Sequence, residues 1–222
     1  MSSLLTPSAV LFDLDGTLVD TVPTRIDAWM AALAENGVTA DRDLVAAMIG
    51  SDGRRLAREV AEHAGIPMKP ARAVEVDARH GEIYERLNTD PEPLPGVGEL
   101  ISALETTGIR WGIATSSGNA RQVTASVAAL RLAASPTVVD GSHVDHAKPA
   151  PDLFLLAAER LGVEDLAACW CVGDATWDMA AAVAAGMVPI GVTAGSAVDA
   201  RALRTAGAVT VVATLADLLP LP

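Results

Sequence analysis

The sequence predicts an α/β fold, a doubly wound parallel sheet with an all-helical segment inserted after the first strand. Six short apolar runs are continuous rather than alternating, which is typical of parallel strands covered on both faces. Helical patterns separate these runs, as a doubly wound sheet requires. Residues 19–91 contain helical patterns and no strand-like run. We therefore expect an α/β core of residues 1–18 and 92–222, and a helical domain of residues 19–91.

The elements follow from these patterns in order along the chain. The expected strands are residues 8–13, 109–115, 136–140, 168–174, 188–193 and 209–212. The expected core helices are residues 96–108, 117–132, 150–162, 176–186 and 196–207, several of which end at Gly, as helices often do. The expected helices of the insert are residues 24–37, 41–50, 53–65 and 71–87. The proline-rich stretch "NTDPEPLPG" indicates the linker back to the core.

Composition excludes several classes of function. The net charge of −12 argues against a nucleic-acid surface, because phosphate backbones are bound by clustered Lys and Arg. No apolar run is long enough to span a membrane and no signal peptide is evident, so we expect a cytoplasmic protein. The two cysteines, Cys169 and Cys171, lack partners for a zinc site and are expected to be buried, reduced thiols.

Polar residues stand where the predicted strands end. Asp13 and Asp15 follow the first strand, Thr115 ends the second, Lys148 lies in the loop after the third, and Asp174 ends the fourth. In open α/β sheets, ligands bind in the crevice beyond the C-terminal ends of the strands. We therefore expect these five residues to converge there.

Each of these residues also has an ordinary structural interpretation. The stretch "DLDGT" is rich in turn residues, Asp174 could cap the next helix, and Lys148 could be a solvated loop lysine. Thr115 and Ser116 could likewise cap a helix. Two carboxylates held together repel, however, and a hard cation such as Mg²⁺ relieves that repulsion.

Taken together, four segments resemble the four motifs of the haloacid dehalogenase superfamily. They are "DLDGT", "IATSS", "AKPAPD" and "VGDATWD". The helical insert is similar to the helical cap of that superfamily, and the resemblance extends from Ala9 to about Thr193. The branch it resembles most is that of the phosphoglycolate phosphatases and β-phosphoglucomutases.

The resemblance implies a phosphatase mechanism. Asp13 would attack the phosphoryl group and form an aspartyl-phosphate, and Asp15 would protonate the leaving alcohol and then activate water. Thr115 and Ser116 would bind the phosphoryl group, while Lys148 would neutralise it and Asp13. The implied substrate is a small phosphorylated metabolite, and both a monomer and a dimer are compatible with the sequence.

The resemblance also implies a Mg²⁺ site. The ion would rest on Asp13, the backbone carbonyl of Asp15, and Asp174. Asp178, one helical turn after Asp174, would bind a water molecule of the metal.

Two alternatives to a phosphatase remain open. The first is a phosphosugar mutase, although that branch tends to have Glu-Asp where this chain has Gly173 and Asp174, and a histidine where Arg25 stands. The second is a non-catalytic binding protein on the same fold, which the complete set of motif residues disfavours. Carbon–halogen cleavage is disfavoured because the dehalogenases lack the second aspartate of the first motif, here Asp15.

Substrate choice is expected to depend on the cap. The stretch "IGSDGRRLAREV" matches the position of the family's specificity loop and contains Arg54, Arg55 and Arg58. These arginines could form an ion-paired, solvated face with Glu59 and Glu62. If one of them points inward, we expect it to be Arg54 and the substrate to carry a second anionic group.

Overall fold

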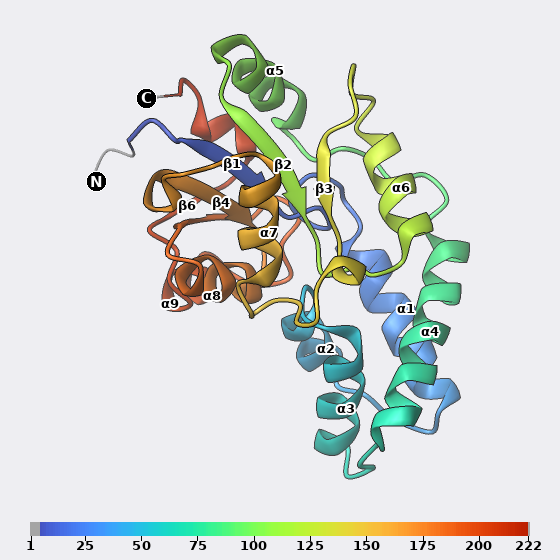
Figure 1. Ribbon diagram of the computed structural model, residues 1–222. Helices are drawn as coiled ribbons and strands as arrows, with labels where there is room; N and C mark the ends of the chain where they lie inside the picture. The colour runs from blue at the N-terminus through green and yellow to red at the C-terminus, as the bar shows by residue number, and fades with distance from the viewer. Residues whose placement is uncertain (1–4, 222) are drawn as a thin grey trace.

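A computed structural model of the protein describes residues 5–221, and its centre is a six-stranded parallel sheet (Figure 1). The strands are β1 (Ala9–Phe12), β2 (Arg110–Ala114), β3 (Thr137–Val139), β4 (Cys169–Gly173), β5 (Val188–Val192) and β6 (Thr210–Val212). Their order across the sheet is β3-β2-β1-β4-β5-β6. The chain therefore winds outward from β1 to β3 and then returns to the other side of β1, so the switch point lies between β1 and β4.

Successive residues of the central strands β1 and β4 belong to two different hydrophobic layers. In β1, Val10 and Phe12 pack in the layer that contains α5 (Val97–Thr107) and α6 (Ala120–Ala129). Ala9 and Leu11 pack in the opposite layer. That layer contains α7 (Asp152–Arg160) and α8 (Thr176–Ala184). Because both faces are covered, all of β1 is buried, which explains its continuous apolar run.

The remaining elements of the core are short. Helix α9 (Ala200–Thr205) packs on β5 and β6 beside α8. The 3₁₀ helices are η1 (Gly141–His143), η2 (Leu166–Ala168) and η3 (Leu215–Leu218), of which η3 packs on α5.

Four helices lie between β1 and α5 in the chain. They are α1 (Val22–Glu35), α2 (Arg42–Met48), α3 (Gly53–His63) and α4 (Pro70–Leu87). They pack mainly against one another and have a hydrophobic cluster of their own, separate from the two layers of the sheet. Figure 1 shows this helical group at the end of the sheet toward which the β1 and β2 arrows point.

The chain enters and leaves the helical group through two adjacent segments. The N–H of Asp20 donates to the carbonyl of Glu92, and the N–H of Leu94 donates to the carbonyl of Leu18, both at 2.9 Å. A further contact joins the group to the core, since the indole Nε1 of Trp177 on α8 donates to the carbonyl of Ala47 at 3.1 Å. The helical group is thus attached both at its connections and beside the loop that follows β4.

The predicted fold class is confirmed. Every expected strand and helix occurs among residues 5–221, with ends that differ by a few residues because the apolar patterns run past the hydrogen-bonded segments. Cys169 and Cys171 are both buried and free in β4, as expected. The division into domains at residues 18/19 and 91/92 remains a prediction. Within the described residues, none of the helices combines the length and the apolar character needed to cross a bilayer.

Candidate active site

Two carboxylates end the two strands that flank the switch point. Asp13 follows β1 directly and Asp174 follows β4, and the pairing of Phe12 with Val172 sets these strand ends side by side. The N–H of Asp13 also donates to the carbonyl of Val172 at 2.9 Å. The ladder between neighbouring parallel strands therefore brings together side chains that are far apart in the sequence.

The loop after β3 supplies a buried cation to these carboxylates. Lys148 is fully buried, and its Nζ lies 2.5 Å from Oδ1 of Asp13 and 2.7 Å from Oδ1 of Asp178. A solvated loop lysine would show neither feature. Lys148 is therefore part of the site, and the surface interpretation of this residue is excluded.

The carboxylates outnumber the cation. One oxygen atom each of Asp13, Asp174 and Asp178 lies within 4.8 Å of the others, and all three side chains are buried. Burial raises the pKa of Asp13 to about 7, even with Lys148 beside it. Burial also raises the pKa of Asp174 well above its ordinary range, and the nearby charge of Asp178 adds to this effect.

The donor set fits a divalent cation. When all three carboxylates are ionised, Lys148 balances one charge and leaves two negative charges buried together. Oxygen ligands are those that Mg²⁺ prefers. The cluster contains Asp178 itself, whereas the sequence assigned Asp178 only to a metal-bound water; the side chain of Asp15 lies outside it.

Asp174 does not cap the helix that follows it. The N-cap residue of α8 is Ala175, whose N–H donates to Oδ2 of Asp178 at 2.9 Å. The carboxylate of Asp174 instead accepts a hydrogen bond from the hydroxyl of Thr17 at 2.9 Å. Gly16, at a φ of +86°, lies beneath this carboxylate, and a Cβ there would come within 2.4 Å of Oδ2 of Asp174. The turn after β1 thus needs glycine to admit Asp174.

Asp15 is bound by the first helix of the helical group. Its two oxygen atoms accept from the hydroxyl of Thr21 and from Nη2 of Arg25, each at 2.8 Å. Arg25 is itself buried and stacks over the ring of Tyr84, with the guanidinium carbon 4.2 Å from the ring centroid. The sequence interpretation noted Arg25 only as a departure from the mutases, and missed this ion pair.

The loop between β2 and α6 forms another wall of the site. The hydroxyl of Thr115 accepts from the N–H of Ser117 at 3.1 Å, while Asn119 is the residue that caps α6. Ser116 has a buried hydroxyl without a hydrogen-bond partner. Thr115 and Ser116 therefore do not cap α6, and the buried hydroxyl of Ser116 is free for a ligand.

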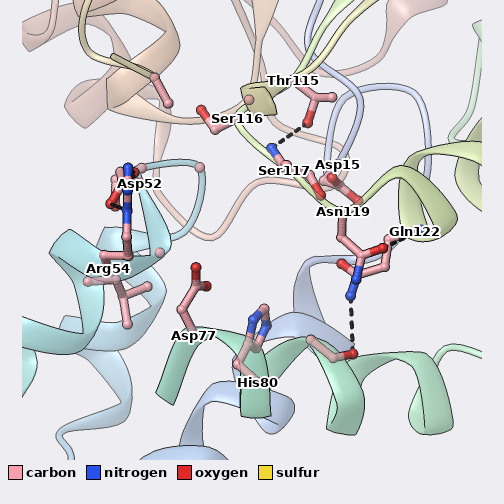
Figure 2. Close-up of a pocket in the computed structure, with 18 of the residues that line it drawn as sticks. Asp15, Asp52, Arg54, Asp77, His80, Thr115, Ser116, Ser117, Asn119 and Gln122 are labelled. Carbon is pink, nitrogen blue, oxygen red and sulfur yellow. Dashed lines mark hydrogen bonds and ion pairs between the residues drawn. The ribbon is translucent and has the colours of Figure 1, made fainter. Parts of the chain in front are cut away.

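A cavity of about 780 Å³ lies between this loop and the helical group. Asp13, Asp15, Thr115 and Ser116 line it, whereas Lys148 and Asp174 are buried and do not line it. Figure 2 shows Asp77 and His80 rising from α4 into the cavity, opposite the loop that carries Thr115. The structure therefore brings the core motif residues together and adds a second wall made by the helical group.

Arg54 lines the cavity but is already paired. Its Nη2 lies 2.6 Å from Oδ2 of Asp52, the N-cap residue of α3, and its Nε also donates to that carboxylate. Arg55 points elsewhere, because it pairs with Glu59 and lies over the ring of Trp177. Of Arg54, Arg55 and Arg58, only Arg54 lines the cavity, and it already holds a carboxylate.

Asp77 and His80 were missed by the sequence interpretation. They stand three residues apart on α4 and so share one face of the helix, but α4 also carries several other charged residues. Burial, with Asp52 nearby, raises the pKa of Asp77 to about 6. Burial and then Arg25 lower the pKa of His80, so that its imidazole is neutral. A sequence offers no sign of which polar residues on such a helix face a cavity.

The charge on Asp77 is expected to destabilise the fold above pH 6. The pKa of Asp77 is about 6 in the folded protein against 3.8 ordinarily, so the folded state binds the proton more tightly, and stability falls as the pH rises from about 4 to 6. Asp77→Asn should therefore raise the free energy of unfolding at pH 8 by roughly 1–3 kcal/mol. Urea denaturation at pH 8 and pH 5 measures this, and an equal gain at both would contradict the assignment.

Comparisons with known proteins extend over most of the chain. A family model described as haloacid dehalogenase-like hydrolase matches residues 7–186. The chain is 33% identical over 198 residues to fructose-1-phosphate phosphatase of Escherichia coli, covering 88% of this chain and 97% of that protein. It is 31% identical to β-phosphoglucomutase of Bacillus subtilis, covering 84% of each chain. A solved structure of a hydrolase from Pseudomonas syringae superposes with a TM-score of 0.89 at 33% identity, over 97% of this chain and 96% of that one. The similarity thus includes both the sheet and the four inserted helices.

Proposed function

Since this chain belongs to the haloacid dehalogenase-like hydrolase family, we propose that it is a Mg²⁺-dependent phosphatase of a small phosphomonoester. The observation that carries the proposal is the contact of Asp13 with the buried Lys148: Asp13 belongs to a cluster of three buried carboxylates and also lines the cavity. A carboxylate in that position can attack a phosphoryl group that enters from the cavity.

The first half of the reaction transfers the phosphoryl group to the protein. A carboxylate oxygen of Asp13 forms a bond to phosphorus as the ester P–O bond breaks, and Asp15 gives a proton to the departing alkoxide. Lys148 holds Asp13 in place and offsets its charge. Ser116 and Thr115 are the residues we assign to binding the phosphoryl oxygens.

The second half returns the protein to its starting state. Asp15 takes a proton from water, whose oxygen attacks phosphorus as the bond to Asp13 breaks, and inorganic phosphate leaves. Thr21 and Arg25 each hold one oxygen of Asp15, which fixes the position of the carboxylate through both steps.

A bound Mg²⁺ would supply charge neutralisation between the phosphoryl group and the carboxylates. The residues we assign to it are Asp13, the backbone carbonyl of Asp15, and Asp174, with Asp178 beside them. The two uncompensated negative charges of the cluster support this assignment.

The packing around Gly173 favours a phosphatase over a phosphosugar mutase. A Cβ at residue 173 would come within 2.4 Å of the Cβ and Cγ of Asp178. Glutamate at this position, as the mutase branch tends to have, would therefore displace Asp178.

We assign residues 19–91 to a cap that covers the substrate. The cavity has walls from both the core and this segment, and Arg54 and Asp77 lie on the segment's side. A closed cap would exclude bulk water and strengthen the electrostatic interactions in the site.

Phosphate release tests the proposed function. With Mg²⁺ and without any bisphosphate activator, the protein is expected to release inorganic phosphate from p-nitrophenyl phosphate and from at least one metabolite of a phosphomonoester panel. Excess EDTA should lower the rate by at least about a hundredfold, and added Mg²⁺ should restore it. Release that requires a bisphosphate, or an isomerised ester as the main product, would favour the mutase instead.

A further inference from the structure

The wall that the helical group contributes to the cavity has no uncommitted cation. We call this wall the cap face and define it by Arg25, Asp52, Arg54, Asp77 and His80. Its two arginines are each paired with a carboxylate, Arg25 with Asp15 and Arg54 with Asp52. His80 is neutral, because burial and then Arg25 lower its pKa. A second anionic group on a substrate would therefore meet carboxylates here and no free positive charge.

The cap face does offer uncommitted hydrogen-bonding groups. The carboxylate of Asp77 accepts no hydrogen bond and forms no ion pair with any other residue of the described range 5–221. His80 is 5% exposed and its Nε2 has no partner, although its ring is stacked at 4.0 Å on Trp29. In Arg54, Nε and Nη2 are used by Asp52, which leaves Nη1 as a donor.

These groups match the hydrogen bonding of alcohols. A hydroxyl can donate to the carboxylate of Asp77 and accept from Nη1 of Arg54, and the imidazole of His80 can serve a neighbouring hydroxyl. A buried polar group without a partner costs free energy, so a ligand that satisfies several of them gains affinity and selectivity over one that does not.

We infer that the cap face binds a neutral, polyhydroxylated leaving group, so that the substrate is a sugar or polyol phosphate. This inference rests on the proposed phosphatase function. Asp77 is the specificity-determining residue, and phosphoglycolate is disfavoured because its carboxylate would face Asp77 and Asp52. The expectation of a second anionic group at Arg54 is thereby replaced by a hydroxyl contact at the same residue.

A packing role for Asp77 has to be separated from this one. The side chain lies against the start of α3, where a Cβ on Gly53 would come within 2.1 Å of its Oδ1. Asparagine has the same shape and fills the same space. Asp77→Asn therefore keeps the packing, removes the charge and replaces one acceptor oxygen by an NH2 group, so it tests the carboxylate without opening a cavity.

The test compares three classes of ester. The specificity constants kcat/KM are measured for fructose 1-phosphate and glucose 6-phosphate, for phosphoglycolate, and for p-nitrophenyl phosphate, which has no hydroxyl on its leaving group. Wild-type protein should prefer at least one sugar phosphate to phosphoglycolate by about tenfold or more. In Asp77→Asn that sugar phosphate should lose about tenfold or more and phosphoglycolate should gain, while the aryl phosphate, whose leaving group has no hydroxyl, should lose less than the sugar phosphate.

Glu75→Gln is the matched control, since it removes a carboxylate from the same helix, where Glu75 forms an exposed ion pair with Arg72. In this variant kcat/KM should keep its wild-type value for all three classes of ester.

Two outcomes would overturn the inference. One is a wild-type protein that prefers phosphoglycolate to the sugar phosphates; the other is an equal loss of kcat/KM on all three classes in Asp77→Asn, which would indicate a packing role. Absence of phosphate release from every ester, the aryl phosphate included, would instead contradict the proposed function itself.

Discussion

Asp13→Asn is expected to lower phosphate release from p-nitrophenyl phosphate by at least about a thousandfold. The amide of asparagine has the shape of the carboxylate but is a poor nucleophile, so no aspartyl-phosphate can form. An aryl phosphate has a good leaving group and needs little from the cap, so it reports on the nucleophile alone. The rate is followed by the absorbance of p-nitrophenolate at saturating Mg²⁺.

The same substitution should leave the protein folded. Burial raises the pKa of Asp13 to about 7, so the ionised carboxylate lowers the free energy of unfolding above that pH. The neutral amide of asparagine does not carry this charge and removes the destabilisation. Lys148 keeps Asp178 as an ion-pair partner at 2.7 Å. We expect the metal-free variant to unfold at a urea concentration no lower than that of the wild type at pH 8.

Asp90→Asn provides the matched control, since it makes the same change at an exposed position and should keep full activity. A well-folded Asp13→Asn variant with activity within tenfold of wild type would show that the nucleophile is another residue.

Lys148→Met is expected to cause the largest loss of stability, roughly 3–5 kcal/mol at pH 8 in the absence of divalent cations. The substitution keeps an apolar stem of similar length but removes the buried ammonium that pairs with Asp13 and Asp178, two of the three clustered carboxylates. Activity toward the aryl phosphate should also fall, because the charge that offsets Asp13 is gone.

The pH dependence of this loss identifies its cause. Burial raises the pKa values of Asp13 and Asp174, so both carboxylates take up protons as the pH falls, and the missing cation then matters less. The destabilisation should therefore be smaller at pH 5 than at pH 8. An equal loss at both pH values would mean that Lys148 contributes by packing rather than by charge.

Lys69→Met is the natural control for Lys148→Met, because residues 69 and 148 are the only lysines in the chain. Lys69 is exposed before α4, and its substitution should change the free energy of unfolding by less than about 0.5 kcal/mol.

The part of the site that the core contributes could be predicted, because it depends on which residues directly follow each strand in the sequence. Each parallel strand ends at the same edge of the sheet, so residues that follow strands, such as Asp13 and Asp174, must meet there. Lys148 required more than position, since a loop lysine is usually solvated; the combination of motifs supplied that information.

The cap face could not be predicted in the same way. Whether Arg25 reaches Asp15, or whether Asp77 faces the cavity, depends on how a separate group of helices is oriented on the sheet. That orientation is set by contacts such as the one from Trp177 to Ala47, which have no pattern in the sequence. Helix periodicity indicates which residues share a face, but not what that face meets.

The paired connections between the sheet and the helical group bear on how such a protein can change over evolution. Leu18 and Leu94 are joined by a backbone hydrogen bond, and so are Asp20 and Glu92. The residues between these pairs form an inserted segment, and the two ends of this segment are already held side by side by the core. Lengthening, shortening or replacing the inserted segment therefore costs little additional loop-closure entropy. The same active site in the core can be combined with different inserted segments, and so acquire new substrates while the core keeps its structure.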